Sequence, residues 1–91
     1  MPYIKQNRRQ EFDSLLAQLG PKVQNKGELN YCVSILMLWF VETHGENYQT
    51  LSDAKNALID ATEEFVERHI KDYEAKKREE NGDLELYIPA L

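Results

Sequence analysis

The sequence predicts an all-α protein: a three-helix antiparallel bundle with one long C-terminal helix, a short extended tail and an oligomeric state. Three observations support this prediction. Apolar residues recur at helical spacing in separate stretches, glycines end each stretch, and the last stretch is much longer than the others. With 91 residues the chain is long enough for one domain. We expect a single helical domain over residues 1–83, followed by an apolar tail over residues 84–91.

The first helix is predicted in the stretch NRRQEFDSLLAQLGP, residues 7–21. Asn7 and Gln10 have the spacing of a capping box, which would begin the helix. Gly20 and Pro21 would end it. One face carries apolar side chains at helical spacing: Phe12, Leu15, Leu16 and Leu19.

The second helix is predicted to start near Gly27 or Glu28 and to end at His44, before Gly45. It contains the run YCVSILMLWFV, residues 31–41, in which serine is the one conventionally polar residue. The run itself fits a buried strand or a helix, but the flanking segments GELN and ETHG are better helix ends than strand ends. It is too short for a membrane span, which needs about 20 residues. A helix that is apolar all round must be covered all round.

The third helix is predicted to begin at a cap formed by Thr50 and Asp53 and to continue for about 29 residues. Charged pairs such as Glu64 with Arg68 support its exposed faces. The turn Asn81-Gly82 ends it. A seam of apolar residues follows helical spacing: Leu51, Ala54, Leu58, Ala61 and Phe65. The tail LELYIPAL, residues 84–91, alternates apolar and polar residues and is expected to be an edge strand or an extended arm.

The length of the third helix predicts self-association. At 1.5 Å per residue it is roughly 43 Å long, whereas a compact chain of this size is roughly 30 Å across. The two shorter helices cannot cover both this helix and every side of residues 31–41. We therefore expect a second copy of the chain to supply the missing cover, as in obligate interfaces. The residues expected in that interface are Ile35, Leu38, Trp39, Leu58 and Phe65.

Charge and cysteine content exclude several classes of protein. The net charge of −5 disfavours nucleic-acid binding. Residues 1–26 nevertheless carry a net charge of +3 and residues 27–91 carry −8, so the basic segment either packs against acidic helices or forms an anion-binding corner. Cys32 is the single cysteine and is expected to be a reduced, buried thiol. Without an apolar signal segment or a membrane span, we expect a cytoplasmic protein.

Catalytic motifs are absent from the sequence. It contains no GxGxxG, GxxxxGK or GxSxG motif, and we expect no enzyme activity, cofactor or metal. His44 and His69 lie on different predicted helices without a metal-ligating neighbour at helical spacing. Carboxylates at positions 63, 64 and 67 form a patch that fits a metal-assisted enzyme or a solvated helix face.

The segment KGELNY, residues 26–31, is the best candidate for a binding site. Amides at the start of a helix attract anions, and Lys26, Asn30 and Tyr31 add a charge, hydrogen-bonding groups and a stacking ring. Arg8 adds a planar guanidinium suited to phosphate. These residues equally fit a purely structural role. Asn30 would then form a local cap, Tyr31 would pack against apolar side chains, and Arg8 would form an ion pair with an acidic helix.

Four separated motifs together resemble one family of small proteins encoded in bacterial and phage genomes. They are MPYIKQ, GELNY, NYQTL and YEAKKREENGD, in this order, and the resemblance spans residues 1–83. The family has no assigned function, so the resemblance implies a small helical fold and a bacterial or phage origin, but no active site.

Two functions are expected from these residues. The first is a non-enzymatic, homo-oligomeric binding protein that sequesters a small anionic, nucleotide-like signalling molecule. Arg8, Lys26, Asn30 and Tyr31 would line its site. The second is an interaction module or inhibitor that presents the long helix and the tail to a host protein.

Overall fold

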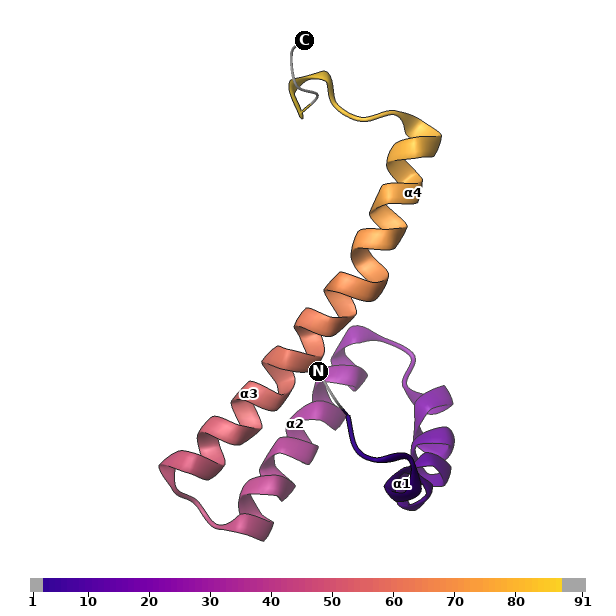
Figure 1. Cartoon of the computed structure of the whole chain (residues 1–91). Coiled ribbons are helices and arrows are strands. Elements are labelled where there is room, and N and C mark those ends of the chain that lie inside the picture. Colours follow the sequence, from indigo (N-terminus) through magenta and orange to yellow (C-terminus); the bar gives the residue numbers. More distant parts are fainter. Residues whose placement is uncertain (1–2, 88–91) are drawn as a thin grey trace. The chain divides into compact units, whose positions relative to one another are not determined.

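The computed structural model describes residues 3–87, and every regular element among them is helical (Figure 1). The elements are α1 (Gln6–Leu19), the 3₁₀ turn η1 (Gly20–Lys22), α2 (Lys26–His44), α3 (Tyr48–Phe65), the π-helical segment η2 (Val66–Ile70), α4 (Lys71–Asn81) and the 3₁₀ turn η3 (Glu85–Tyr87). The prediction of an all-α protein is confirmed. So is the prediction of three helical stretches with the longest at the C-terminal end, because α3, η2 and α4 follow one another without a break.

The start of α1 differs from the prediction. The helix begins at Gln6, and its N-cap residue is Lys5, which makes no side-chain capping bond. The N–H of Arg8 donates to the carbonyl of Lys5 at 2.9 Å, so Asn7 already lies inside the first turn. A residue inside the helix cannot cap it, and the predicted Asn7–Gln10 capping box is therefore wrong. At the other end Gly20 and Pro21 end the α-helix as predicted, by forming η1.

The apolar run 31–41 is helical, as its flanks predict. The N-cap of α2 is Asn25, whose side chain accepts a hydrogen bond from the N–H of Glu28 at 2.8 Å. The Glu28 carboxylate accepts from the N–H of Gln24 at 2.8 Å. The first bond satisfies a backbone donor that the helix start leaves free, and the second ties the residue before the cap to the first turn. Gly45 ends α2 with φ +89°, a backbone conformation that favours glycine.

The long helix begins three residues earlier than predicted. α3 starts at Tyr48, and the side chain of Asn47 accepts from the N–H of Thr50 at 2.9 Å. Thr50 therefore lies inside the helix, and its predicted role as the cap is wrong. The reason is local: Asn47 is itself a strong cap residue and lies one turn upstream. α4 ends at Gly82 with φ +82°, at the predicted Asn81-Gly82 turn.

The second half of the long helix carries ion pairs at helical spacing. Glu64 pairs with Arg68 at 2.9 Å, as predicted, and Glu67 pairs with Lys71 at 2.7 Å. Within the same stretch, Val66–Ile70 forms a π-helical segment. No sequence signal predicted this segment, which adds about one residue to a helical turn.

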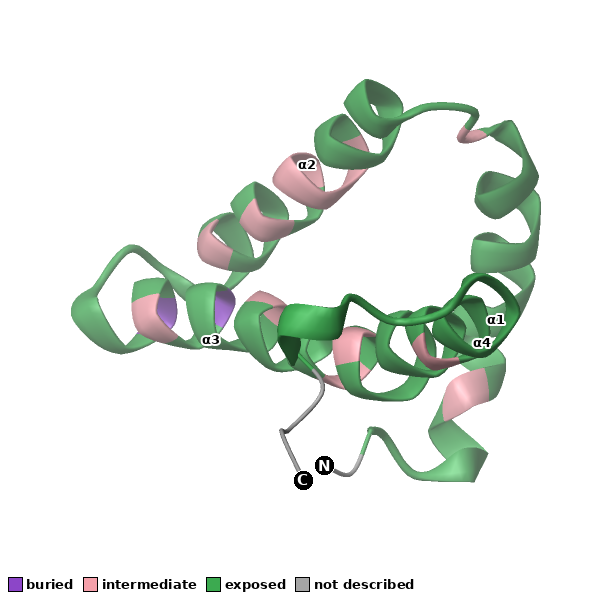
Figure 2. Cartoon of the chain, turned by 90° about the horizontal axis from the view of Figure 1, so that it is seen from above, coloured by how far each residue is buried: buried purple, intermediate pink, exposed green. Residues whose placement is uncertain are grey.

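Few of the described residues are buried (Figure 2). The chain separates into two compact units, Met1–Asn56 and Ala57–Leu91. Among residues 3–87 only Thr50 and Ala54 are buried, both in the N-terminal half of α3. Most large apolar side chains of α1 and α2 stay exposed, including Leu15 (64%), Leu38 (64%) and Trp39 (63%). Most large apolar side chains of α1 and α2 are therefore in contact with water.

The tail does not form a strand in its described part. Glu85–Tyr87 is the turn η3, and Leu84, Leu86 and Tyr87 are exposed. The rest of the predicted arm, including Ile88, lies outside the described residues. In residues 3–87 no helix combines the length and the apolar character that crossing a bilayer requires.

Candidate functional site

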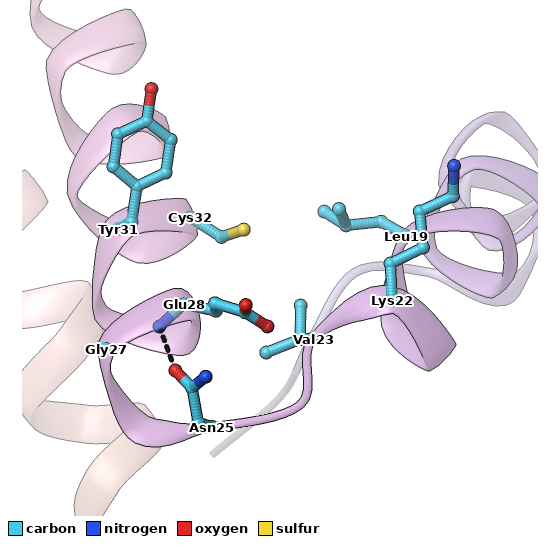
Figure 3. A pocket seen from close by; sticks show the side chains of 8 residues that line it. All are labelled: Leu19, Lys22, Val23, Asn25, Gly27, Glu28, Tyr31 and Cys32. Atoms are coloured by element: carbon cyan, nitrogen blue, oxygen red, sulfur yellow. Dashed lines mark hydrogen bonds between the residues drawn. The ribbon is translucent and has the colours of Figure 1, made fainter.

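A pocket lies in the first unit, where the connection from α1 leads into α2 (Figure 3). Its volume is about 420 Å³, which falls in the range of small-molecule sites. Its lining residues come from the end of α1, from η1, from the connection after it and from the first turns of α2: Leu19, Lys22, Val23, Asn25, Gly27, Glu28, Tyr31 and Cys32. We call it the corner pocket.

The walls of the corner pocket are mainly apolar. Leu19 and Cys32 point toward each other from opposite sides, with Val23 between them (Figure 3). Leu19 and Lys22 come from the side of α1, whereas Tyr31 and Cys32 come from α2. Such a pocket suits a ligand with an apolar or aromatic body and few polar groups.

The helix start beside the pocket is already capped. The amide of Glu28 is bonded to Asn25, and the Glu28 carboxylate carries a negative charge into the same turn (Figure 3). A carboxylate there offsets the positive end of the helix dipole. The helix terminus alone is thus a weaker anion site than the sequence predicted, and Lys22 is the cation among the lining residues.

The four predicted ligand residues have different surroundings. Tyr31 lines the corner pocket. Lys26 and Asn30 lie in the first turns of α2 but are not part of the lining. Asn30 accepts a hydrogen bond from the Ser34 hydroxyl at 3.4 Å. Arg8 lies on α1 and pairs with Glu11 at 3.4 Å. The structure therefore brings Tyr31 to the pocket and leaves the other three out of its wall.

Sequence reasoning missed most of the pocket wall. Lys22 belongs to the basic segment 1–26, and Leu19 is predicted only as part of an apolar helix face. Val23 and Asn25 had no predicted role at the site. The spacing Asn25-x-x-Glu28 is a capping signature that the sequence does display. It would have placed the N-cap at Asn25 and the first helical residue at Lys26.

The predicted interface residues lie on two different helices. Ile35, Leu38 and Trp39 line a hollow of about 190 Å³ on α2, together with Glu42. Leu58 is half-buried and Phe65 is 57% exposed, both on α3 in the second unit. The three residues of α2 thus line one hollow of the first unit, whereas Leu58 and Phe65 belong to the second unit.

Each of the two histidine rings lies against a phenylalanine one turn earlier in the chain. The His44 ring stacks on Phe40 with centroids 4.3 Å apart, and its Nδ1 lies 2.9 Å from the Phe40 carbonyl oxygen. The His69 ring lies 5.3 Å from that of Phe65. In the part of the chain that the structure describes, no three histidine, cysteine or acidic side chains are grouped to hold a metal ion.

Two carboxylates of the predicted acidic patch take part in ion pairs. Glu64 pairs with Arg68 and Glu67 with Lys71. The hydrogen bond and the charge of Glu67 raise the pKa of Lys71 above its ordinary value of 10.5. These pairs indicate a solvated helix face more directly than a catalytic centre.

The helices and the corner pocket define a small all-helical protein with an apolar pocket and with largely uncovered apolar helices. Residues 1–84 match a family described as Domain of unknown function (DUF6899), and the chain belongs to this family. The match agrees with the resemblance of its motifs to a family without an assigned function. No curated protein and no solved structure matches the chain.

Proposed function

We propose that this protein is a non-enzymatic binding protein that acts as a homo-oligomer and holds a small anionic molecule in the corner pocket. The observation that supports the proposal best is the pocket itself. Its volume is about 420 Å³, its walls are mainly apolar, and Tyr31 and Lys22 are among the residues that line it. These features suit a ligand with an aromatic body and an anionic group, which is the chemistry of a nucleotide.

Each lining group has a role in this proposal. The ring of Tyr31, 66% exposed in the chain, offers a face for stacking. Lys22 neutralises the anionic group, and Leu19, Val23 and Cys32 exclude water from the apolar body. The Glu28 carboxylate repels an anion close to the start of α2. The anionic group of the ligand therefore lies toward Lys22. A bacterial or phage origin and a cytoplasmic location belong to the same proposal, in which the protein sequesters a signalling nucleotide.

Native mass spectrometry on protein purified without denaturation tests the proposal, because it reports the subunit count and any retained small molecule together. We expect an oligomer carrying extra mass of a few hundred daltons. Lys22→Ala should remove the extra mass, whereas Lys26→Ala, which changes a lysine that does not line the pocket, should keep it. Loss in Lys26→Ala with retention in Lys22→Ala would favour the predicted site at the helix start over the corner pocket. An oligomer without any retained mass in the wild type contradicts ligand sequestration.

A second function is favoured by one observation in the second unit. Leu84, Leu86 and Tyr87 are exposed, Leu86 by 98%, and an uncovered apolar segment of this kind is typical of a docking element. In this alternative, the long helix and the tail bind a host protein. Removal of residues 84–91 should then abolish capture of that protein while the circular dichroism of the domain stays unchanged. Normal capture after the truncation would exclude the tail.

A further inference from the structure

Three polar residues of the corner pocket follow one another at a spacing of three along the start of α2. They are Asn25, Glu28 and Tyr31. Residues three apart lie on one side of a helix, about one turn from each other, and a turn rises about 5.4 Å. A flat ring that stacks on Tyr31 therefore has its edge within reach of the two residues at the helix start.

Asn25 holds a hydrogen-bond donor at the pocket wall. Its Oδ1 accepts from the N–H of Glu28 at 2.8 Å, and this bond fixes which end of the side-chain amide is the oxygen. The other end is the Nδ2 group with its two N–H donors. Within residues 3–87, no hydrogen bond takes up this group. The cap thus orients a donor that the helix itself does not use.

Glu28 holds an acceptor beside this donor. Its Oε1 accepts from the N–H of Gln24 at 2.8 Å, which ties the carboxylate to the backbone. The carboxylate forms no ion pair with any other described residue, so Oε2 and the negative charge are left for a ligand. Figure 3 shows the Asn25 amide and the Glu28 carboxylate on the α2 side of the pocket, with Lys22 across from them.

A donor beside a carboxylate distinguishes the edges of the nucleic-acid bases. Adenine and cytosine carry an amino group, which donates to a carboxylate, next to an unprotonated ring nitrogen, which accepts from an amide N–H. Hypoxanthine and uracil carry a carbonyl oxygen in place of the amino group, and an ionised carboxylate has no proton to share with it. Guanine presents two adjacent donors that need both carboxylate oxygens, but Oε1 of Glu28 is already engaged.

We propose that the corner pocket recognises the base of its ligand, and that this ligand is a nucleotide with an amino group beside an unprotonated ring nitrogen. The inference rests on the proposed function, in which the anionic group lies toward Lys22 and the base lies toward the helix start. The amino group donates to Oε2 of Glu28, the ring nitrogen accepts from Nδ2 of Asn25, and the ring stacks on Tyr31. Backbone hydrogen bonds already hold both polar partners, so little side-chain freedom is lost on binding.

Calorimetric titration with two matched pairs of mononucleotides tests the specificity. Adenosine and inosine monophosphate (AMP and IMP) have the same sugar and phosphate and differ at the base edge, and so do cytidine and uridine monophosphate (CMP and UMP). We expect AMP over IMP, or CMP over UMP, by at least about tenfold, the discrimination of one bidentate base contact. Equal binding within both pairs, or a preference for IMP or UMP, overturns the inference and leaves the proposed function standing. If none of the four binds, the inference fails, and a native mass spectrum without retained mass contradicts the proposed function as well.

Two substitutions test the assigned contacts. Asn25→Ser keeps an N-cap of similar strength and removes the amide donor. Glu28→Gln keeps an acceptor for the N–H of Gln24 and removes the charge. Each should reduce the preference within a pair to less than about threefold, because the lost contact belongs to the amino-bearing base alone.

The ratio of the two affinities separates recognition from a structural effect. A substitution that merely loosens the helix start weakens both members of a pair equally and keeps their ratio. Lys22→Ala is the matched control, because it removes the partner of the phosphate, which both members share, and should also keep the ratio. An unchanged ratio in both Asn25→Ser and Glu28→Gln would overturn the assigned contacts.

Discussion

Removing the side chain that begins α2 should destabilise the whole first unit. Asn25 accepts a hydrogen bond from the N–H of Glu28 at 2.8 Å and is the one side-chain cap of the helix that holds the apolar run 31–41. In the Asn25→Ala variant, the backbone N–H of Glu28 loses its hydrogen-bond acceptor in the protein. Replacing an asparagine cap by alanine costs about 1 kcal/mol. For a chain of this length, that loss lowers Tm by about 4–8 °C.

The assay is thermal unfolding followed by circular dichroism, with wild type and variants at one protein concentration, because the proposed self-association would make Tm depend on concentration. Asn7→Ala is the matched control. Asn7 is the cap that sequence spacing predicts for α1, but it lies inside the first turn, so its replacement should shift Tm by about 2 °C or less. Equal shifts for both variants, or an unchanged Tm for Asn25→Ala, would refute the assigned helix start.

Three further predictions concern stability. Gly45→Ala should cost on the order of 1–3 kcal/mol, because φ at this residue is +89°. Gly20→Ala, with φ −50° and open space around it, should be nearly neutral in the same urea titration; equal losses would refute the reasoning. Ala54→Glu should lower the free energy of unfolding by about 2 kcal/mol or more, since Ala54 is buried and a charge there loses its hydration. Unchanged stability would mean that this position is open to water. The pKa of Lys71 is raised by Glu67, so this pair stabilises the folded chain fully below pH 10.5 and loses its effect as the pH rises through the raised pKa. Nitrogen-detected NMR titration should show the raised pKa, and Glu67→Gln should return it to about 10.5.

The ends of the helices were the more predictable part of the fold. Gly45 and Gly82 end α2 and α4 with positive φ, and glycine at such a position is readable from sequence because few other residues tolerate it. Helix starts were less predictable. The segment around α3 offers both Asn47 and Thr50 as caps, and only the backbone hydrogen bonds decide between them.

The corner pocket was only partly predictable for a related reason. Tyr31 follows a recognisable helix start, so its place in the first turns of α2, where it lines the pocket, could be inferred from local sequence. Val23 and Leu19 reach the same pocket because η1 turns the chain between α1 and α2. The direction of that turn depends on the backbone angles of three residues, which spacing and composition do not specify.

The sequence predicts that one chain is too small to cover its own apolar helices, but it does not specify the surface that a partner would cover. The length of the third helix and the apolar run both indicated that one chain is too small to bury them. The predicted interface includes residues of both α2 and α3. Ile35, Leu38 and Trp39 line a common hollow on α2, whereas Leu58 and Phe65 lie in the second unit. Apolar spacing predicts which face of a single helix is apolar, but not which side chains line one hollow.

The π-helical segment Val66–Ile70 behaves as a one-residue insertion that the helix has absorbed without breaking. One extra residue in an α-helix rotates everything after it by about 100°. The side of α4 that aligns with a given side of α3 is thus set by this segment, and not by a continuous repeat in the sequence. Deleting one residue from this segment would restore the α-helical hydrogen-bond pattern with little loss of helix. The charged pairs of α4 would then be rotated about the helix axis relative to α3. Homologues that differ in length at this point would then present different faces of α4 on an otherwise unchanged helix.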